Sequence, residues 1–211
     1  MNPKDLSSYS RKFIIELMPL VLFSKSYGVD FLISSGCSLY LQFNTVCNNY
    51  FAKDERIYRI PYSKSEIFLS NDLNLKEKRE LSRVISNCMH FATNPELKDI
   101  NSTHTYEKDT QVSEEEEALF EAYKNKPVSE YFKKLGVDSK VLDLLLYAIA
   151  FVNESETQTT TQEFFQRTAK YLRSIGYYGN SPMIMSEFGS SEYLQAFSRL
   201  SAVFGGIFAI N

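Results

Sequence analysis

Apolar residues recur at helical spacing through the middle of the chain, and capping patterns indicate where several helices begin. Three pairs of polar residues have the spacing of a capping box, in which each side chain bonds a free backbone N–H of the other residue. They are Ser63 with Glu66, Asn74 with Glu77, and Thr160 with Glu163. The pattern predicts helices that begin near residues 63, 74 and 160. The second extends to about residue 91 and the third to about 175.

Other segments also have helical character. Residues 11–35 predict two short helices, because Pro19 and Gly28 interrupt their apolar pattern. Residues 128–135 predict another short helix, which a glycine ends. Residues 141–152 are apolar almost all round, so we expect a buried helix at the centre of a bundle.

The ends of the chain carry the predicted strands. Residues 39–43 and 56–60 have strand-like patterns, with a turn-rich connection at 48–55. Two glycines end the last helix, and residues 207–210 then predict a short apolar strand. A buried strand at a terminus needs neighbours beyond it, so we expect a fragment of a longer protein.

These elements predict an α+β protein that is mostly helical. We expect an all-α helical subdomain inserted into a sheet-containing domain that this chain supplies only in part. The sheet-containing domain takes residues 1–12, 36–62 and 177–211, and the helical domain takes residues 13–35 and 63–176.

Residues 94–126 differ from the rest of the helical domain. They are acidic, with four consecutive glutamates from Glu114 to Glu117, and they are poor in aliphatic side chains. We therefore expect a solvated, mobile insertion, within which residues 115–123 allow a short helix. An acidic partner-binding role is the alternative.

Composition excludes some classes of function. The chain has 211 residues, 44% of them hydrophobic, and a net charge of −3, which is unsuited to nucleic acid. Its three cysteines lack metal-ligand spacing, and their odd number favours a reduced cytosolic compartment. The sequence has no evident signal peptide, and its longest apolar run, residues 144–152, is too short to span a bilayer.

The chemistry of an enzyme is not evident in the sequence. The glycine pair follows a helix, whereas a phosphate-binding loop precedes one. The two histidines fit neither a Ser-His-Asp arrangement nor a metal site. The sequence therefore favours binding over catalysis, and we expect no cofactor and no metal.

The last predicted helix carries the most informative pattern. Glu192, Gln195 and Arg199 are spaced to project from one face, where they can touch one partner together. We expect the apolar residues of the helix to lie largely on the other side, namely Phe197, Leu200, Val203 and Phe204. The alternative for the polar trio is an ordinary solvated helix face.

Several blocks, in order, carry a resemblance to a known family. They are RKFIIELMPLVLFSKSYGVDFLI (11–33), SLYLQF (38–43), IPYSKSEIFLSNDLNLKEKR (60–79) and the segment 178–211. The chain resembles the Rab escort protein and Rab GDP-dissociation inhibitor family over nearly its whole length. The resemblance implies part of a flavoprotein-like α/β domain that binds Rab, with an inserted helical domain that holds a geranylgeranyl lipid.

The resemblance also implies a function. An escort protein is a non-catalytic accessory factor in the cytosol. It presents GDP-bound Rab GTPases to Rab geranylgeranyltransferase and then carries the lipidated product to membranes. The alternatives are a GDP-dissociation inhibitor that recycles prenylated Rabs and, from another class, a flavin-dependent oxidoreductase.

Three sets of residues take roles from the resemblance. Glu192, Gln195 and Arg199 match the Rab-binding platform. The family's Gly-Glu-Leu-Pro-Gln is Ser-Glu-Tyr-Leu-Gln here (191–195), which changes how the chain enters the helix. Phe68 and Arg79 have the eleven-residue spacing of the pair that docks escort proteins onto the transferase α subunit, although Phe68 also suits a helical core.

The implied lipid site needs an apolar slot between helices. The predicted helices supply possible walls, all of which are also ordinary core residues: Val84, Ile85, Leu145, Ile149 and Tyr171.

Overall fold

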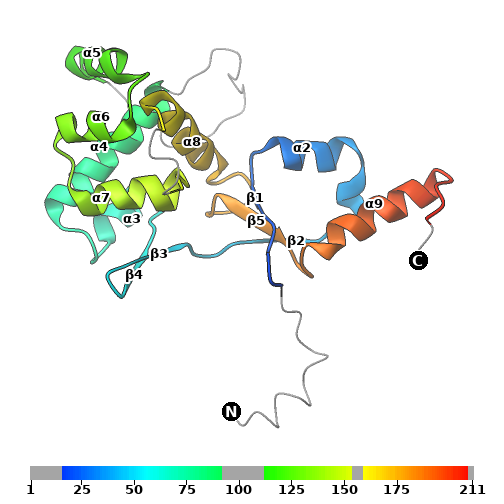
Figure 1. Ribbon diagram of the computed structural model, residues 1–211. Helices are drawn as coiled ribbons and strands as arrows, with labels where there is room; N and C mark the ends of the chain where they lie inside the picture. The colour runs from blue at the N-terminus through cyan, green and yellow to red at the C-terminus, as the bar shows by residue number, and fades with distance from the viewer. Residues whose placement is uncertain (1–15, 92–111, 154–158, 209–211) are drawn as a thin grey trace, which may run out of the picture. The chain divides into compact units, whose positions relative to one another are not determined.

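The computed structural model describes residues 16–91, 112–153 and 159–208, which form two compact α+β units (Figure 1). Unit 1 contains the described residues 16–46 and 183–208. Unit 2 contains those between 47 and 182. Unit 2 therefore lies in the sequence between the two halves of unit 1.

Unit 1 is a small antiparallel sheet with helices. Its strands are β1 (Val21–Phe23), β2 (Phe43–Thr45) and β5 (Met183–Ser186), in the order β1-β5-β2. Its helices are α2 (Tyr27–Ser34), the 3-10 helix η2 (Cys37–Tyr40) and α9 (Ser191–Val203). Their buried side chains form one core, made of Leu32, Cys37, Leu41, Tyr193 and Ala196.

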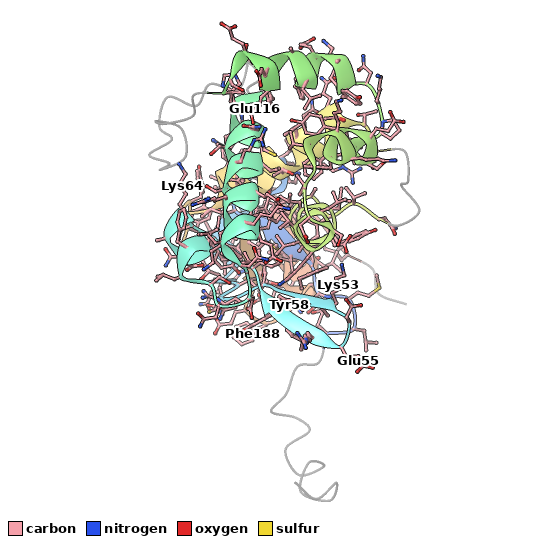
Figure 2. The ribbon with its side chains drawn as sticks, turned by 90° about the vertical axis from the view of Figure 1, so that its left-hand side faces the viewer. Lys53, Glu55, Tyr58, Lys64, Glu116 and Phe188 are labelled. Carbon is pink, nitrogen blue, oxygen red and sulfur yellow. The ribbon has the colours of Figure 1, made fainter. Side chains whose placement is uncertain are left out.

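Unit 2 combines a hairpin with helices. The hairpin pairs β3 (Tyr50–Lys53) with β4 (Arg56–Arg59). Asp54 and Glu55 form its turn with φ angles of 50° and 62°, and Figure 2 shows Glu55 at the tip. The helices are α3 (Lys64–Leu69), α4 (Leu75–Phe91), α5 (Glu114–Tyr123), α6 (Val128–Leu135), α7 (Ser139–Asp143), the π-helical segment η4 (Leu144–Ile149) and α8 (Thr161–Ser174).

The helix starts predicted from the capping pairs are confirmed, but only one of the three pairs forms the full box. The Thr160 hydroxyl accepts from the N–H of Glu163, whose carboxylate accepts from Arg167. Asn74 and Glu77 form the full reciprocal box, with N–H to side-chain oxygen distances of 2.7 and 2.9 Å. The Ser63 hydroxyl accepts from the backbone N–H of Glu66, whereas the Glu66 carboxylate accepts from Tyr62. Each cap satisfies backbone groups that a helix start leaves unpaired, which fixes these boundaries locally.

Aromatic side chains fill the core of unit 2. Phe132 and Phe164 meet edge to face with ring centroids 5.2 Å apart, and Phe165 is edge-on to Tyr131 at 5.5 Å. All four side chains are buried. Such edge-to-face pairs add about 0.5–1.5 kcal/mol each to the burial of apolar surface, so this cluster holds α6 against α8.

Several predicted elements are wrong. Residues 21–23 form strand β1, where we expected helix, because β5 pairs with them from the far end of the chain. Residues 37–40 are a 3-10 helix, so the strand predicted at 39–43 begins only at Phe43. Strand β3 occupies part of the expected turn-rich connection. Residues 207–208 are exposed and form no strand; 209–211 lie outside the described residues.

The predicted domain boundaries also need correction. The described residues 16–35 belong to unit 1, because β1 bonds to β5 there. Residues 47–62 and 177–182 belong to unit 2. The β3–β4 hairpin means that unit 2 is not all-α, and an ion pair between Lys53 and Asp143 ties this hairpin to the helices.

The acidic segment is only partly as expected. Residues 94–111 lie outside the described residues. Helix α5 is confirmed, with a capping box between Ser113 and Glu116. It is not simply solvated: Phe120 is buried, and Glu116 pairs with Arg83 of α4. Glu116 therefore has a structural role, which the acidic composition of the segment did not reveal.

Candidate functional site

Helix α9 presents the predicted polar trio, which we call the α9 surface: Glu192, Gln195 and Arg199. The helix turns Tyr193 and Ala196 into the core of unit 1, with Phe197 and Leu200 packed against that core. Gln195 and Arg199 are exposed and Glu192 is partly exposed. The expected separation of faces is therefore confirmed for these residues. Val203 and Phe204 differ, because both are exposed at the end of the helix.

Polar contacts fix the start of α9. The Glu192 carboxylate accepts a hydrogen bond from the backbone N–H of Phe188 at 3.2 Å. The N–H of Ser190 donates to the Glu16 carboxylate at 2.7 Å, and the Ser190 hydroxyl accepts from the N–H of Leu20 at 3.0 Å. Because carboxylates are favourable at a helix N-terminus, these contacts stabilise the helix entry without the family's glycine and proline.

Arg199 has a partner that the sequence did not reveal. Its guanidinium lies 5.0 Å from the centre of the Tyr40 ring, within the range of a cation–π interaction. Tyr40 ends η2, and its neighbour Leu39 is exposed. The contact joins η2 to the α9 surface and restricts the Arg199 side chain. Tyr40 lies in the block at 38–43 but was not among the predicted site residues.

Two glycines, Gly205 and Gly206, follow the C-terminal end of α9. Gly205 has a φ of 84°, and the N–H of Gly206 donates to the carbonyl of Ser201 at 2.8 Å. A Cβ at Gly206 would lie 2.2 Å from the Ser201 hydroxyl oxygen. The helix end therefore favours glycine at Gly205 for its conformation and at Gly206 because a side chain there would crowd Ser201.

The second predicted site, Phe68 and Arg79, lies where α3 meets α4. We call the surface there the α3–α4 corner, and it also includes the exposed Leu69 and Leu75. Ile67 fills the core, whereas Phe68 is 54% exposed, so Phe68 is not a core residue. Leu69 and Leu75 are 79% and 61% exposed, and Arg79 is exposed. Leu75 occupies the first turn of α4 and lies outside the core.

A backbone contact holds the α3–α4 corner. The Lys78 ammonium donates to the carbonyl oxygen of Phe68 at 2.7 Å. This bond satisfies a carbonyl at the end of α3 and places the start of α4 beside it. The side chain of Phe68 stays available at the surface. Exposed aromatic and arginine side chains are both enriched in binding hot spots.

The five predicted lipid-site residues lie in the core of unit 2. Val84 and Ile85 come from α4, Leu145 and Ile149 from η4, and Tyr171 from α8. Helix α8 contacts both α4 and η4. None of the five side chains is more than 2% exposed, so they fill the core in this conformation.

Two ionisable side chains of unit 2, Glu116 and Cys88, have pKa values shifted by their surroundings in the fold. Burial opposes ionisation of Glu116, but hydrogen bonds from Arg83 and Asn87 outweigh it and lower the pKa of this carboxyl. Desolvation raises the pKa of the Cys88 thiol well above its usual value, which keeps the thiol protonated and unreactive. Within the described ranges, no group of three histidine, cysteine or acidic side chains has a metal-binding arrangement.

The helices that the structure describes are all too short or too polar to cross a bilayer.

Comparisons with known proteins identify a family for the chain. The family described as GDP dissociation inhibitor matches residues 2–211. The chain belongs to this family. The resemblance drawn from the sequence blocks is thereby confirmed.

The curated relatives that are similar to the chain include transferase components and a GDP dissociation inhibitor. Rab proteins geranylgeranyltransferase component A 1 of Caenorhabditis elegans is 30% identical over 97% of this chain, and its Rattus norvegicus counterpart is 28% identical over 95%. A probable secretory pathway GDP dissociation inhibitor 1 of Schizosaccharomyces pombe is 26% identical over the whole chain. The chain spans only 37%, 27% and 43% of these three proteins, respectively.

A solved structure supports the fold. A crystal structure of Rab GDI from Plasmodium falciparum superposes with a TM-score of 0.60, covering 90% of this chain and 41% of that one. Its sequence identity of 20% bears on the fold alone. Together, the comparisons do not favour the flavin-dependent oxidoreductase alternative.

Proposed function

We propose that this chain is part of a Rab escort protein, a non-catalytic component that presents GDP-bound Rab GTPases to Rab geranylgeranyltransferase. The observation that carries this proposal is the exposure of Phe68 beside α4, eleven residues before Arg79. A buried Phe68 would have removed the feature that distinguishes the escort branch. Relatives that are named as component A of that transferase also support it.

In this proposal the α9 surface contacts Rab. Arg199, steadied by Tyr40, and Gln195 offer hydrogen-bond donors, and Glu192 offers carboxylate oxygen. Unit 1 is then part of the flavoprotein-like α/β domain, and the rest of that domain completes the Rab contact. The α3–α4 corner of unit 2 docks onto the α subunit of the transferase.

The geranylgeranyl lipid enters the core of unit 2 after transfer. Each methylene removed from water contributes about 0.8 kcal/mol, so a twenty-carbon chain gains much from an apolar slot. The five core residues named above line this slot. Because all five side chains are now buried in the core, the helices must separate to admit the lipid. The escort then acts in the cytosol and visits membranes only to deliver its product.

A GDP-dissociation inhibitor is the second candidate, favoured by the similarity to the Schizosaccharomyces pombe protein over the whole chain. Both functions use the α9 surface and the lipid slot. They differ in the transferase contact alone.

Binding to the transferase in the presence of Rab tests the proposal. We expect tight binding that Phe68→Ala weakens by about 2 kcal/mol or more, the loss typical of a hot spot. Ile57→Ala is the matched control, because Ile57 is an exposed apolar side chain of the same unit that lies on strand β4, outside the α3–α4 corner. Rab binding without any transferase binding would reject the escort role and assign the recycling role.

A further inference from the structure

The π-helical segment η4 differs from the other helices of unit 2 in how it ends. The N–H of Ala150 donates to the carbonyl of Leu145, and the N–H of Val152 donates to that of Leu146, each at 2.9 Å. These bonds span five and six residues, whereas α-helical bonds span four. The end of η4 is therefore wound more loosely than an α-helix.

Phe151 lies between these two bonds in an unusual conformation. Its φ is 51°, in the left-handed region that non-glycine residues seldom occupy. Its neighbours Ala150 and Val152 are buried, whereas Phe151 is 48% exposed. Strain of this kind persists only where the surrounding structure imposes it, and it is often found at sites that move.

The Phe151 ring lies beside the ring of one of the proposed lipid-site residues. Its centroid lies 6.2 Å from that of Tyr171, which is 1% exposed. Tyr147, one turn earlier in η4, is also partly exposed. Phe151 is therefore an exposed ring next to a buried one, where the end of η4 meets α8.

The opposite end of η4 is anchored. Asp143, immediately before η4, forms an ion pair with Lys53 of the hairpin, and this contact raises the pKa of the Lys53 ammonium. Lys140 of α7 lies 4.7 Å from the ring centre of Tyr58 and 3.8 Å from the Glu77 carboxylate. Figure 2 shows Lys53 and Tyr58 on the hairpin. One end of η4 is thus fixed by charge, and the other is loosely wound and strained.

We propose that Phe151 is the gate of the lipid slot and that the end of η4 swings about the anchored end to open it. This inference rests on the proposed function, because it assigns the entry point of the same slot. In the closed state, the Phe151 ring covers Tyr171. On opening, the wide turn rewinds, Phe151 leaves its strained conformation, and the lipid reaches the core.

Stopped-flow binding of a fluorescent peptide that ends in a geranylgeranylated cysteine tests the gate. The variant is Phe151→Gly, because glycine adopts a φ of 51° without strain and leaves no ring. We expect the association and dissociation rate constants to rise together severalfold, while Kd changes by less than about twofold, as removal of a gate requires. Phe188→Ala, which removes an equally exposed phenylalanine from unit 1, is the matched control and leaves both rates unchanged.

The outcomes separate the two ideas. If the unaltered protein binds the peptide and Phe151→Gly leaves both rates unchanged, the gate is wrong and the lipid-binding function stands. If only dissociation accelerates and Kd rises, Phe151 is a wall of the slot, which also overturns the gate. If the unaltered protein does not bind the peptide, the lipid-binding part of the proposed function fails, and the gate fails with it. Circular dichroism and the unfolding midpoint establish that Phe151→Gly is folded.

Discussion

The α9 surface and the core of unit 2 carry proposed sites of opposite kinds. Glu192, Gln195 and Arg199 already project from one face of a helix whose start is fixed by hydrogen bonds. The five proposed lipid-site residues are buried against other core residues. A protein partner can therefore meet a site that is formed in advance, whereas a lipid must first displace packed side chains. Substitutions in the first site can therefore leave the stability of the core unchanged, whereas substitutions in the second site affect it.

The largest expected effect is on stability, and it tests whether the proposed lipid-site residues are part of the packed core of unit 2. Leu145→Ala should lower the free energy of unfolding by about 2–5 kcal/mol, because it leaves a cavity in a packed core. Leu194→Ala, on the exposed side of α9, is the matched control and should cost no more than about 0.5 kcal/mol. Urea denaturation monitored by circular dichroism measures both. Equal losses would mean that the two regions do not differ as the structure indicates.

The next effect is on Rab binding. Arg199→Ala should weaken the affinity for GDP-bound Rab by about 1.5–3 kcal/mol, the range for a hydrogen bond to a charged group. It should leave the unfolding midpoint unchanged, because Arg199 is exposed. Isothermal titration calorimetry with the purified Rab measures the affinity. A stability loss without a change in affinity would make Arg199 a structural residue.

A smaller effect sharpens the same site. Tyr40→Leu should weaken Rab binding by about 0.5–1 kcal/mol, because the cation–π contact that positions Arg199 is lost. In the Arg199→Ala background the same substitution should have no further effect. A double-mutant cycle measures this coupling. Additive losses would show that Tyr40 contacts Rab independently.

The smallest effect concerns pH and helix α5. The pKa of Glu116 is lowered in the folded protein, so its contribution to stability is complete above the ordinary glutamate pKa of 4.5 and is lost as the pH falls through the folded value. Glu116→Gln should therefore flatten the loss of stability on acidification below that pKa. Unfolding midpoints across this pH range provide the measurement. Glu115→Gln, on an exposed neighbour, is the control and should leave the acid profile as it is.

Local patterns predicted much of the fold, and long-range pairing accounts for the errors. The caps at Ser63, Asn74 and Thr160 depend on residues three positions away, which the sequence displays directly. Strand β1 depends on β5, at the other end of the chain, and its apolar residues suit a helix equally well. The helical interpretation of residues 21–23 failed because no local signal separates these two outcomes.

The same division holds for the proposed sites. Helical spacing was sufficient to place Glu192, Gln195 and Arg199 on one face. It was not sufficient to find Tyr40, which reaches Arg199 only through the packing of η2 on α9. Nor did it locate Phe151, whose strained conformation and contact with Tyr171 arise from the folded core.

By itself, the sequence determined the helix starts, the polar face of α9 and membership of a family, because each depends on residue order alone. Only the tertiary structure decided that Phe68 is exposed while its neighbour Ile67 is buried. Both are large and apolar, so hydrophobicity does not distinguish them. They differ in the direction of their side chains relative to the core. That direction is set by how α3 packs against α4.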